Sequence, residues 1–141
     1  MKKLISLILL TLSCGISGIC SAQIAVVVSA KSPATALNKE QAAALFLGKS
    51  TQLPGAGTPV LVDQGETSEL RKNFYNKVAE KTPSQVKAVW ARLVFSGKAS
   101  PPKEALSTAE VKKLVSANPD AVGYIEKSAV DPSLKVLLEI D

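Results

Sequence analysis

The chain has 141 residues, with 17 basic and 12 acidic side chains, a net charge of +5 and no histidine. Charges of opposite sign are interspersed, and no basic run is long enough to predict a surface for nucleic acid or membrane. Both cysteines, Cys14 and Cys20, lie near the amino terminus. The rest of the chain therefore lacks the usual general base, thiol nucleophile and soft metal ligands. We expect no enzyme, no metal site and no cofactor.

Residues 1–22 have the pattern of a secretory signal peptide, because two lysines precede a short apolar run, Leu4 to Leu12. This run is too short to span a bilayer. We expect cleavage near Ala22, delivery to the periplasm and no membrane association afterwards. Removing two of the 17 basic residues leaves 15 against 12 acidic ones, a charge of +3. Residues 23–141 are expected to form a single α/β domain.

The mature chain begins with a continuous β-branched apolar run, Ile24–Ser29. Such a run predicts a strand covered on both faces. Ser32, in the turn that follows, is a candidate for the mouth of a binding cleft, and ordinary turn chemistry is the alternative. A capping pair, Asn38 with Gln41, then predicts a helix over Lys39–Leu47 that ends at the next glycine.

A second predicted strand, Pro59–Val62, continues through a glycine into a helix start rich in hydroxyl groups. The first amides of a helix have no internal partner, and a cation follows one turn later. Free amides, the helix dipole, hydroxyls and a guanidinium together form a cradle for phosphate or sulfate. The alternative is an ordinary helix cap with a surface arginine. The predicted ligand-binding residues are Gly65, Thr67, Ser68, Arg71 and Ser32.

The remaining segments alternate between helices and strands. Apolar spacing predicts helices over Ser68–Lys81, from Pro83 onward and after Ser107, and strands over Ala121–Ile125 and Leu134–Ile140. Residues 95–107 are rich in glycine, proline and serine, which predicts a loop. This alternation predicts an α/β fold with a mostly parallel mixed sheet of about four to five strands flanked by helices. Ligands of such sheets favour strand ends where helices begin.

Three landmarks occur in order along the chain: LFLGK at Leu45–Lys49, the strand-to-helix segment with Ser68 and Phe74, and DAVGYIE at Asp120–Glu126. In this order and spacing they resemble the second lobe of phosphate-type periplasmic substrate-binding proteins of ABC transporters, in a short single-lobe form. The resemblance implies one lobe of a type II periplasmic-binding-protein fold. It also implies a secreted protein that binds phosphate or a similar oxyanion, with an ABC-transporter permease as partner.

The chain departs from that family at the proposed cradle. Glu69 and Leu70 replace the Gly-Thr of the family's turn, and Glu66 adds a second carboxylate whose charge opposes phosphate. A single lobe also supplies only half of the clamp. The alternative function is a periplasmic interaction or accessory module that docks on another envelope protein or pairs as a homodimer, without transport of a small ligand. Nucleic acid is not an expected partner.

Overall fold

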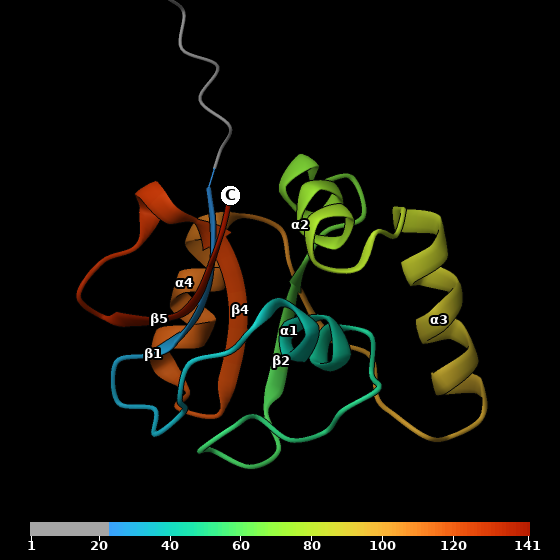
Figure 1. The fold of residues 1–141 in the computed structure, drawn as a ribbon, viewed down its shortest axis with the longest axis horizontal. Coiled ribbons are helices and arrows are strands. Elements are labelled where there is room, and N and C mark those ends of the chain that lie inside the picture. Colours follow the sequence, from blue (N-terminus) through green and yellow to red (C-terminus); the bar gives the residue numbers. More distant parts are fainter. Residues whose placement is uncertain (1–22) are drawn as a thin grey trace, which may run out of the picture.

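The computed structural model describes residues 23–141, so the predicted signal peptide and its cleavage near Ala22 lie outside the described residues. Five strands form one mixed sheet with helices on both faces (Figure 1). The strands are β1 (Ile24–Ser29), β2 (Val60–Gln64), β3 (Lys103–Ala105), β4 (Ala121–Glu126) and β5 (Leu134–Ile140). The helices are α1 (Lys39–Phe46), α2 (Glu69–Ala79), α3 (Pro83–Phe95) and α4 (Thr108–Ala117), with a short 3-10 turn, η1 (Lys127–Ala129). Across residues 23–141, no helix combines the length and apolar character needed to cross a bilayer.

The strand order is β3-β2-β4-β1-β5. Strand β2 is parallel to β3 and β4, whereas β1 is antiparallel to both β4 and β5. Four strands therefore run one way and β1 runs against them, which confirms the predicted mostly parallel mixed sheet. Val122 of β4 is in register with Val28, near the end of β1, and with Leu61, near the start of β2. The carboxyl ends of β1 and β2 consequently lie at opposite ends of the sheet (Figure 1).

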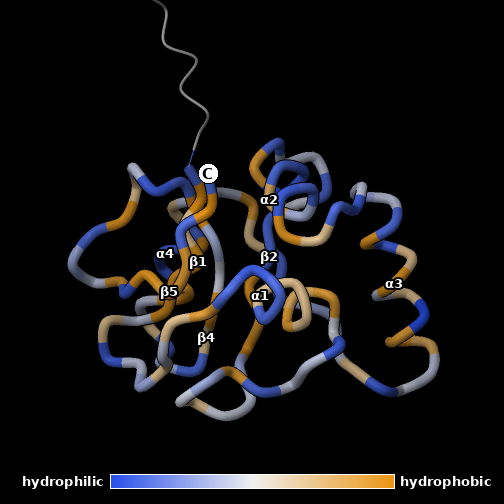
Figure 2. The backbone as a smooth tube through the Cα atoms, in the orientation of Figure 1, coloured by the Kyte–Doolittle hydropathy of each residue, from blue (hydrophilic) through white to orange (hydrophobic). Residues whose placement is uncertain are grey.

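Each face of the sheet has its own hydrophobic core. Ile24, Val26 and Val28 point to the face covered by α1, α2 and α3. Ala25 and Val27 point to the opposite face, which α4 covers. All of β1 is buried, which explains why its sequence is continuously apolar and does not alternate. Figure 2 shows a different pattern in α3, where hydrophobic and hydrophilic residues alternate along the helix. The buried residues of this helix are Val86 and Trp90.

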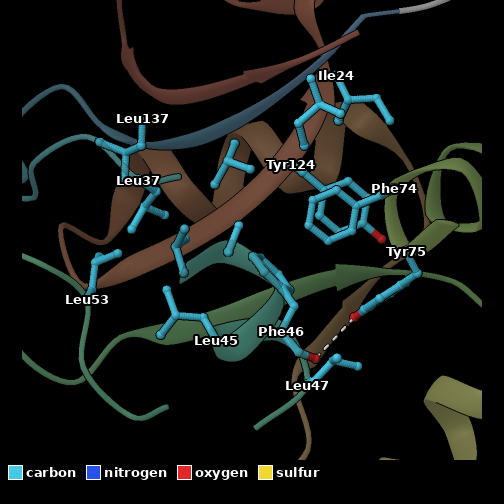
Figure 3. Close-up of a cluster of buried hydrophobic side chains, with 14 of the residues drawn as sticks. Ile24, Leu37, Leu45, Phe46, Leu47, Leu53, Phe74, Tyr75, Tyr124 and Leu137 are labelled. Carbon is cyan, nitrogen blue, oxygen red and sulfur yellow. Dashed lines mark hydrogen bonds between the residues drawn. The ribbon is translucent and has the colours of Figure 1, made fainter. Parts of the chain in front are cut away.

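Four aromatic rings join α1 and α2 to β4. Phe74 stacks on Tyr124 with ring centroids 3.9 Å apart and planes within 6°. Phe46 meets the rings of Phe74 and Tyr124 edge-on, at 5.0 and 5.6 Å. Figure 3 shows the stacked pair, with the Tyr75 hydroxyl directed at the Phe46 carbonyl oxygen. This cluster holds the middle of α2 against α1 and β4.

Helix α4 packs closely against β4 because Gly123 has no side chain. A Cβ atom there would lie 2.9 Å from Val111 Cγ1 and 3.3 Å from Val115 Cγ2. The first distance is shorter than real carbon contacts allow, so a side chain at this position would push α4 off the sheet.

The expectation of a structureless loop over residues 95–107 is wrong, because the edge strand β3 lies within it. Lys103, Glu104 and Ala105 pair in parallel with Val62, Asp63 and Gln64. This strand has three residues and no apolar alternation, so the pairing with β2 defines it and the local sequence does not.

Candidate functional site

The predicted hydroxyl-rich helix start is present at the carboxyl end of β2. Ser68 caps α2, and its Oγ accepts a hydrogen bond from the Arg71 backbone N–H at 3.2 Å. The same hydroxyl donates to Gln64 Oε1 at 3.2 Å, and the Ser68 N–H donates to the Gly65 carbonyl at 3.0 Å. The strand, the turn and the helix are thus held together by local hydrogen bonds.

A buried carboxylate lies directly before this turn. Asp63 is 6% exposed. Its Oδ2 accepts from the Tyr75 hydroxyl at 2.6 Å, and its Oδ1 accepts from the Tyr124 hydroxyl and from the Gln64 backbone N–H, the latter at 2.8 Å. Three donors from α2, β4 and β2 therefore converge on one carboxylate, and they stabilise its charged form away from water.

Both tyrosines remain neutral donors in this arrangement. Burial raises the pKa of Tyr75 well above its usual value, and the negative charge of Asp63 raises it further. The pKa of Tyr124 is raised in the same way, first by burial and then by Asp63. A phenol that keeps its proton can donate a hydrogen bond to the carboxylate.

Arg71 is buried, so the alternative of a surface arginine is wrong. Its side chain is 8% exposed, and Nε lies 3.5 Å from Asp63 Oδ2. The guanidinium carbon lies 5.2 Å from the centre of the Tyr75 ring. Within residues 23–141, its Nη1 is a buried donor without a hydrogen-bond partner. A buried unpaired donor costs about 1–3 kcal/mol, which an acceptor on a ligand would recover.

Arg71 lines a cavity of about 310 Å³ beside the carboxyl ends of β2 and β3. Helix α3 supplies its apolar wall through Trp90, Ala91 and Val94. The rest of the lining is formed by Asp63, Gln64, Glu66, Arg71, Lys87, Pro101, Pro102 and Glu104. Lys87 Nζ lies 3.4 Å from Glu66 Oε1, but both side chains are more than half exposed, so this ion pair is weak.

Trp90 is held in place by its indole N–H, which donates to the Phe46 carbonyl at 2.8 Å. It belongs to the hydrophobic core. Trp90, Pro101 and Pro102 also line a second cavity, of about 390 Å³, which reaches toward the end of α1. In the described part of the chain, no cluster of three or more His, Cys, Asp or Glu side chains could hold a metal ion.

The structure brings four of the predicted site residues together. Gly65, Thr67, Ser68 and Arg71 share the turn and the first turn of α2, and Arg71 alone among them lines the cavity. Gly65 borders it, because a Cβ there would lie 3.3 Å from Glu104 Oε1. Thr67 is exposed.

The structure does not bring Ser32 to this group. Ser32 follows the carboxyl end of β1, which lies at the opposite end of the sheet because β1 is antiparallel to β4. Its Oγ accepts from the Ala34 N–H at 3.2 Å, and its carbonyl accepts from Lys135 Nζ at 2.6 Å. These contacts correspond to the turn chemistry that was the alternative for this residue.

The sequence reasoning did not assign Asp63, Tyr75, Tyr124, Lys87 or Glu104 to the site. Asp63 carried a usable signal, since an acidic residue directly after an apolar strand is unusual unless it has partners. The tyrosines are placed by the fold alone, and Glu104 lies on a strand that the sequence did not reveal.

Comparison with solved structures relates this fold to phosphate-transport proteins. An ABC-type phosphate transport receptor from Vibrio cholerae matches with a TM-score of 0.65 and 26% identity, over 82% of this chain and 46% of the receptor. A phosphate ABC transporter substrate-binding protein with bound phosphate, from Clostridium perfringens, matches with a TM-score of 0.64 and 22% identity, over 82% and 45%. PstS from Borrelia burgdorferi matches with a TM-score of 0.52 and 17% identity, over 82% and 47%.

No family model matches the sequence, and no curated protein matches it. The chain spans less than half the length of each of these structural neighbours. The resemblance that the three sequence landmarks predicted is confirmed at the level of the fold: the chain has the fold of a single lobe of the phosphate-type substrate-binding proteins of ABC transporters.

Proposed function

We propose that the protein is a secreted, periplasmic, non-enzymatic solute-binding protein that holds a small oxyanion group, such as phosphate, beside Arg71 for an ABC-type transport system. The observation that carries this proposal is the buried Arg71 guanidinium, which lines a cavity and has an unpartnered Nη1 donor. The likeness to phosphate-transport receptors supports the same class of ligand.

The chemistry of the site follows from its position at the start of α2. The first amides of this 11-residue helix carry the positive end of its dipole, and Gly65 and Thr67 lie in the turn that precedes it. An oxyanion in the cavity accepts from the Arg71 guanidinium, which lines it. Asp63 keeps the guanidinium in position and offsets its charge, so an open single lobe binds its ligand weakly and reversibly.

A thermal melt tests this proposal. At about ten times its Kd, a ligand stabilises the folded state by about 1.4 kcal/mol. For a chain of this size, the melting temperature then rises by roughly 5 °C. We expect this shift with phosphate or sulfate at millimolar levels, measured at constant ionic strength against sodium chloride.

Two arginine variants supply the comparison. Arg71→Lys keeps the positive charge beside Asp63 but removes Nη1, and we expect it to abolish the shift. Arg92→Lys changes an exposed arginine near the end of α3 and should leave the shift intact. An unshifted melt of the parent protein at high phosphate and sulfate, or equal shifts in the parent and Arg71→Lys, would refute the proposal.

A second candidate function is self-association through the rim of the same cavity. Phe95 is 95% exposed, Leu106 is 81% exposed and Val94 is 44% exposed. Val94 lines the cavity, and Leu106 Cδ2 lies 3.8 Å from the position of a Cβ at Gly65. Val94 and Leu106 thus lie near the cavity, Phe95 follows Val94 at the end of α3, and exposed apolar side chains are typical of an interaction surface.

The length of this chain, compared with that of its structural neighbours, favours a second copy of the chain as the partner at this surface. The matched region spans 41–47% of the structural neighbours, so two copies have roughly the length of one complete neighbour. Sedimentation velocity over a concentration series should show a dimer that Phe95→Ser together with Leu106→Ser converts to a monomer. A strictly monomeric parent protein up to about 100 μM counts against this candidate.

A further inference from the structure

We infer that the preferred occupant of the cavity beside Arg71 is a small zwitterion, a solute with a carboxylate and an ammonium group, and that a bare inorganic anion binds less tightly. This inference rests on the proposed function, because it assigns a class of ligand to the same cavity. It follows from the net charge of the residues that line the cavity, from the unpaired donor Arg71 Nη1 and from the carboxylate of Glu104, which forms no salt bridge among the described residues.

The charges that line the cavity sum to a negative value. Three carboxylates, Asp63, Glu66 and Glu104, face two cations, Arg71 and Lys87. Asp63 is paired with Arg71, and Glu66 is paired with Lys87. Glu104 is exposed to solvent and, within residues 23–141, forms no salt bridge. A dianion in this space would meet an uncompensated negative charge, whereas an ammonium group would neutralise it.

The same lining requires an acceptor as well as a cation. Arg71 lines the cavity and its buried Nη1 has no partner in the part of the chain that the structure describes, so a ligand oxygen that reaches this atom would satisfy it. A carboxylate suits a guanidinium in charge and geometry. One pole of the cavity, at Arg71, therefore favours an anionic oxygen, and the other, at the exposed Glu104, attracts a cation. A small zwitterion supplies both.

The two poles are close enough for one small molecule. Asp63, which holds Arg71, is the register partner of Glu104 on the neighbouring strand. Neighbouring strands lie about 4.8 Å apart, and residues in register point to the same face of the sheet. Glu104 Oε1 lies near Gly65, 3.3 Å from the position that a Cβ would take there. The unpaired carboxylate thus lies beside the turn that leads to Arg71.

The apolar wall of the cavity determines which side chain the ligand can carry. Trp90, Ala91 and Val94 of α3 line the cavity together with Pro102. Its volume of about 310 Å³ equals roughly ten waters in the liquid. This space suits an amino acid with a small apolar side chain, such as valine, more closely than it suits a symmetric tetrahedral anion.

Calorimetric titration of the purified protein with four probes tests this inference. The probes are L-valine, 3-methylbutanoate, which lacks the ammonium group, isobutylamine, which lacks the carboxylate, and inorganic phosphate. We expect L-valine to bind at least about tenfold more tightly than each of the other three, because only L-valine satisfies both poles. Losing either pole leaves a charged group of the protein or ligand without its partner.

Two glutamate variants distinguish the contribution of Glu104 from the effect of removing any negative charge from this part of the protein. In Glu104→Gln, the advantage of L-valine over 3-methylbutanoate should fall by about two- to fivefold, because Glu104 is exposed to solvent. Glu69→Gln removes an exposed carboxylate from the first turn of α2, outside the cavity lining, and should leave that advantage unchanged. The melting temperatures of both variants establish that they are folded.

The outcomes distinguish this inference from the function on which it rests. Phosphate binding more tightly than L-valine overturns the zwitterion and leaves the proposed oxyanion function in place. An equal loss of selectivity in Glu69→Gln and Glu104→Gln overturns the role of Glu104. Absence of binding for all four probes overturns both the inference and the proposed function.

Discussion

Alkaline pH should unfold this protein through its tyrosines, because the sequence contains two and both donate to the same buried carboxylate. Burial and the charge of Asp63 raise the pKa of Tyr75 and of Tyr124 in the folded state. In the unfolded chain both side chains titrate near pH 10, at about the ordinary phenol value. Their contribution to stability is therefore complete below about pH 10 and is lost as the pH rises above it.

The steepness of this loss follows from the number of protons. Each tyrosine that is neutral in the folded state and ionised in the unfolded state removes about 1.4 kcal/mol per pH unit. Two such residues remove about 3 kcal/mol per pH unit. A stability on the order of 5–10 kcal/mol is then exhausted within about two to four pH units.

The near-ultraviolet absorbance of tyrosinate, recorded together with far-ultraviolet circular dichroism, measures this directly. We expect the absorbance to rise only as the helical signal is lost, in one cooperative step. In Tyr75→Phe the amplitude should halve and the slope should fall to about 1.4 kcal/mol per pH unit. A rise in tyrosinate absorbance near pH 10 with unchanged circular dichroism would show that the phenols are accessible, and the reasoning would fail.

Three substitutions test other parts of the structure by chemical denaturation. Asp63→Asn leaves the buried Arg71 cation without a counter-charge and should cost about 3–5 kcal/mol, so a loss below about 1 kcal/mol would contradict the ion pair. Gly123→Ala forces a methyl group against Val111 and should cost about 1–3 kcal/mol, and an unchanged midpoint would rule out this close packing. Lys87→Ala breaks only an exposed pair and should change stability by less than about 1 kcal/mol, so a larger loss would mean that the pair is stronger than its exposure implies.

The sequence predicted the elements whose stabilising interactions involve residues close together in the chain. The helix start at Asn38 forms a capping box with Gln41, as the residue spacing predicted, and Thr82 forms the same kind of box with Gln85. Ser68 caps α2 for the same reason. A cap needs only residues within one turn of each other, so the sequence window contains the whole interaction.

The features that the sequence did not predict depend on distant partners. Asp63 and Tyr124 are separated by 61 positions, and only the pairing of β2 with β4 brings them together. Strand β3, and with it Glu104, exists because β2 offers a partner. Ser32 was expected beside the helix start because a mostly parallel sheet places strand ends together. The direction of β1 has no local signature, and its reversal moves Ser32 to the other end of the sheet.

The position of Arg71 is better explained by binding than by stability. Asp63 already accepts from two phenols and one amide, so its charge is stabilised without a close, two-pronged contact with Arg71, whose Nε lies 3.5 Å away. Burying the guanidinium with Nη1 unpaired costs the free chain energy that a well-packed apolar side chain would not. A buried, unpartnered donor beside a cavity supports the proposal that an acceptor binds there. The tyrosine network holds Asp63, and through Asp63 the guanidinium, in one orientation, as a preorganised binding site would require.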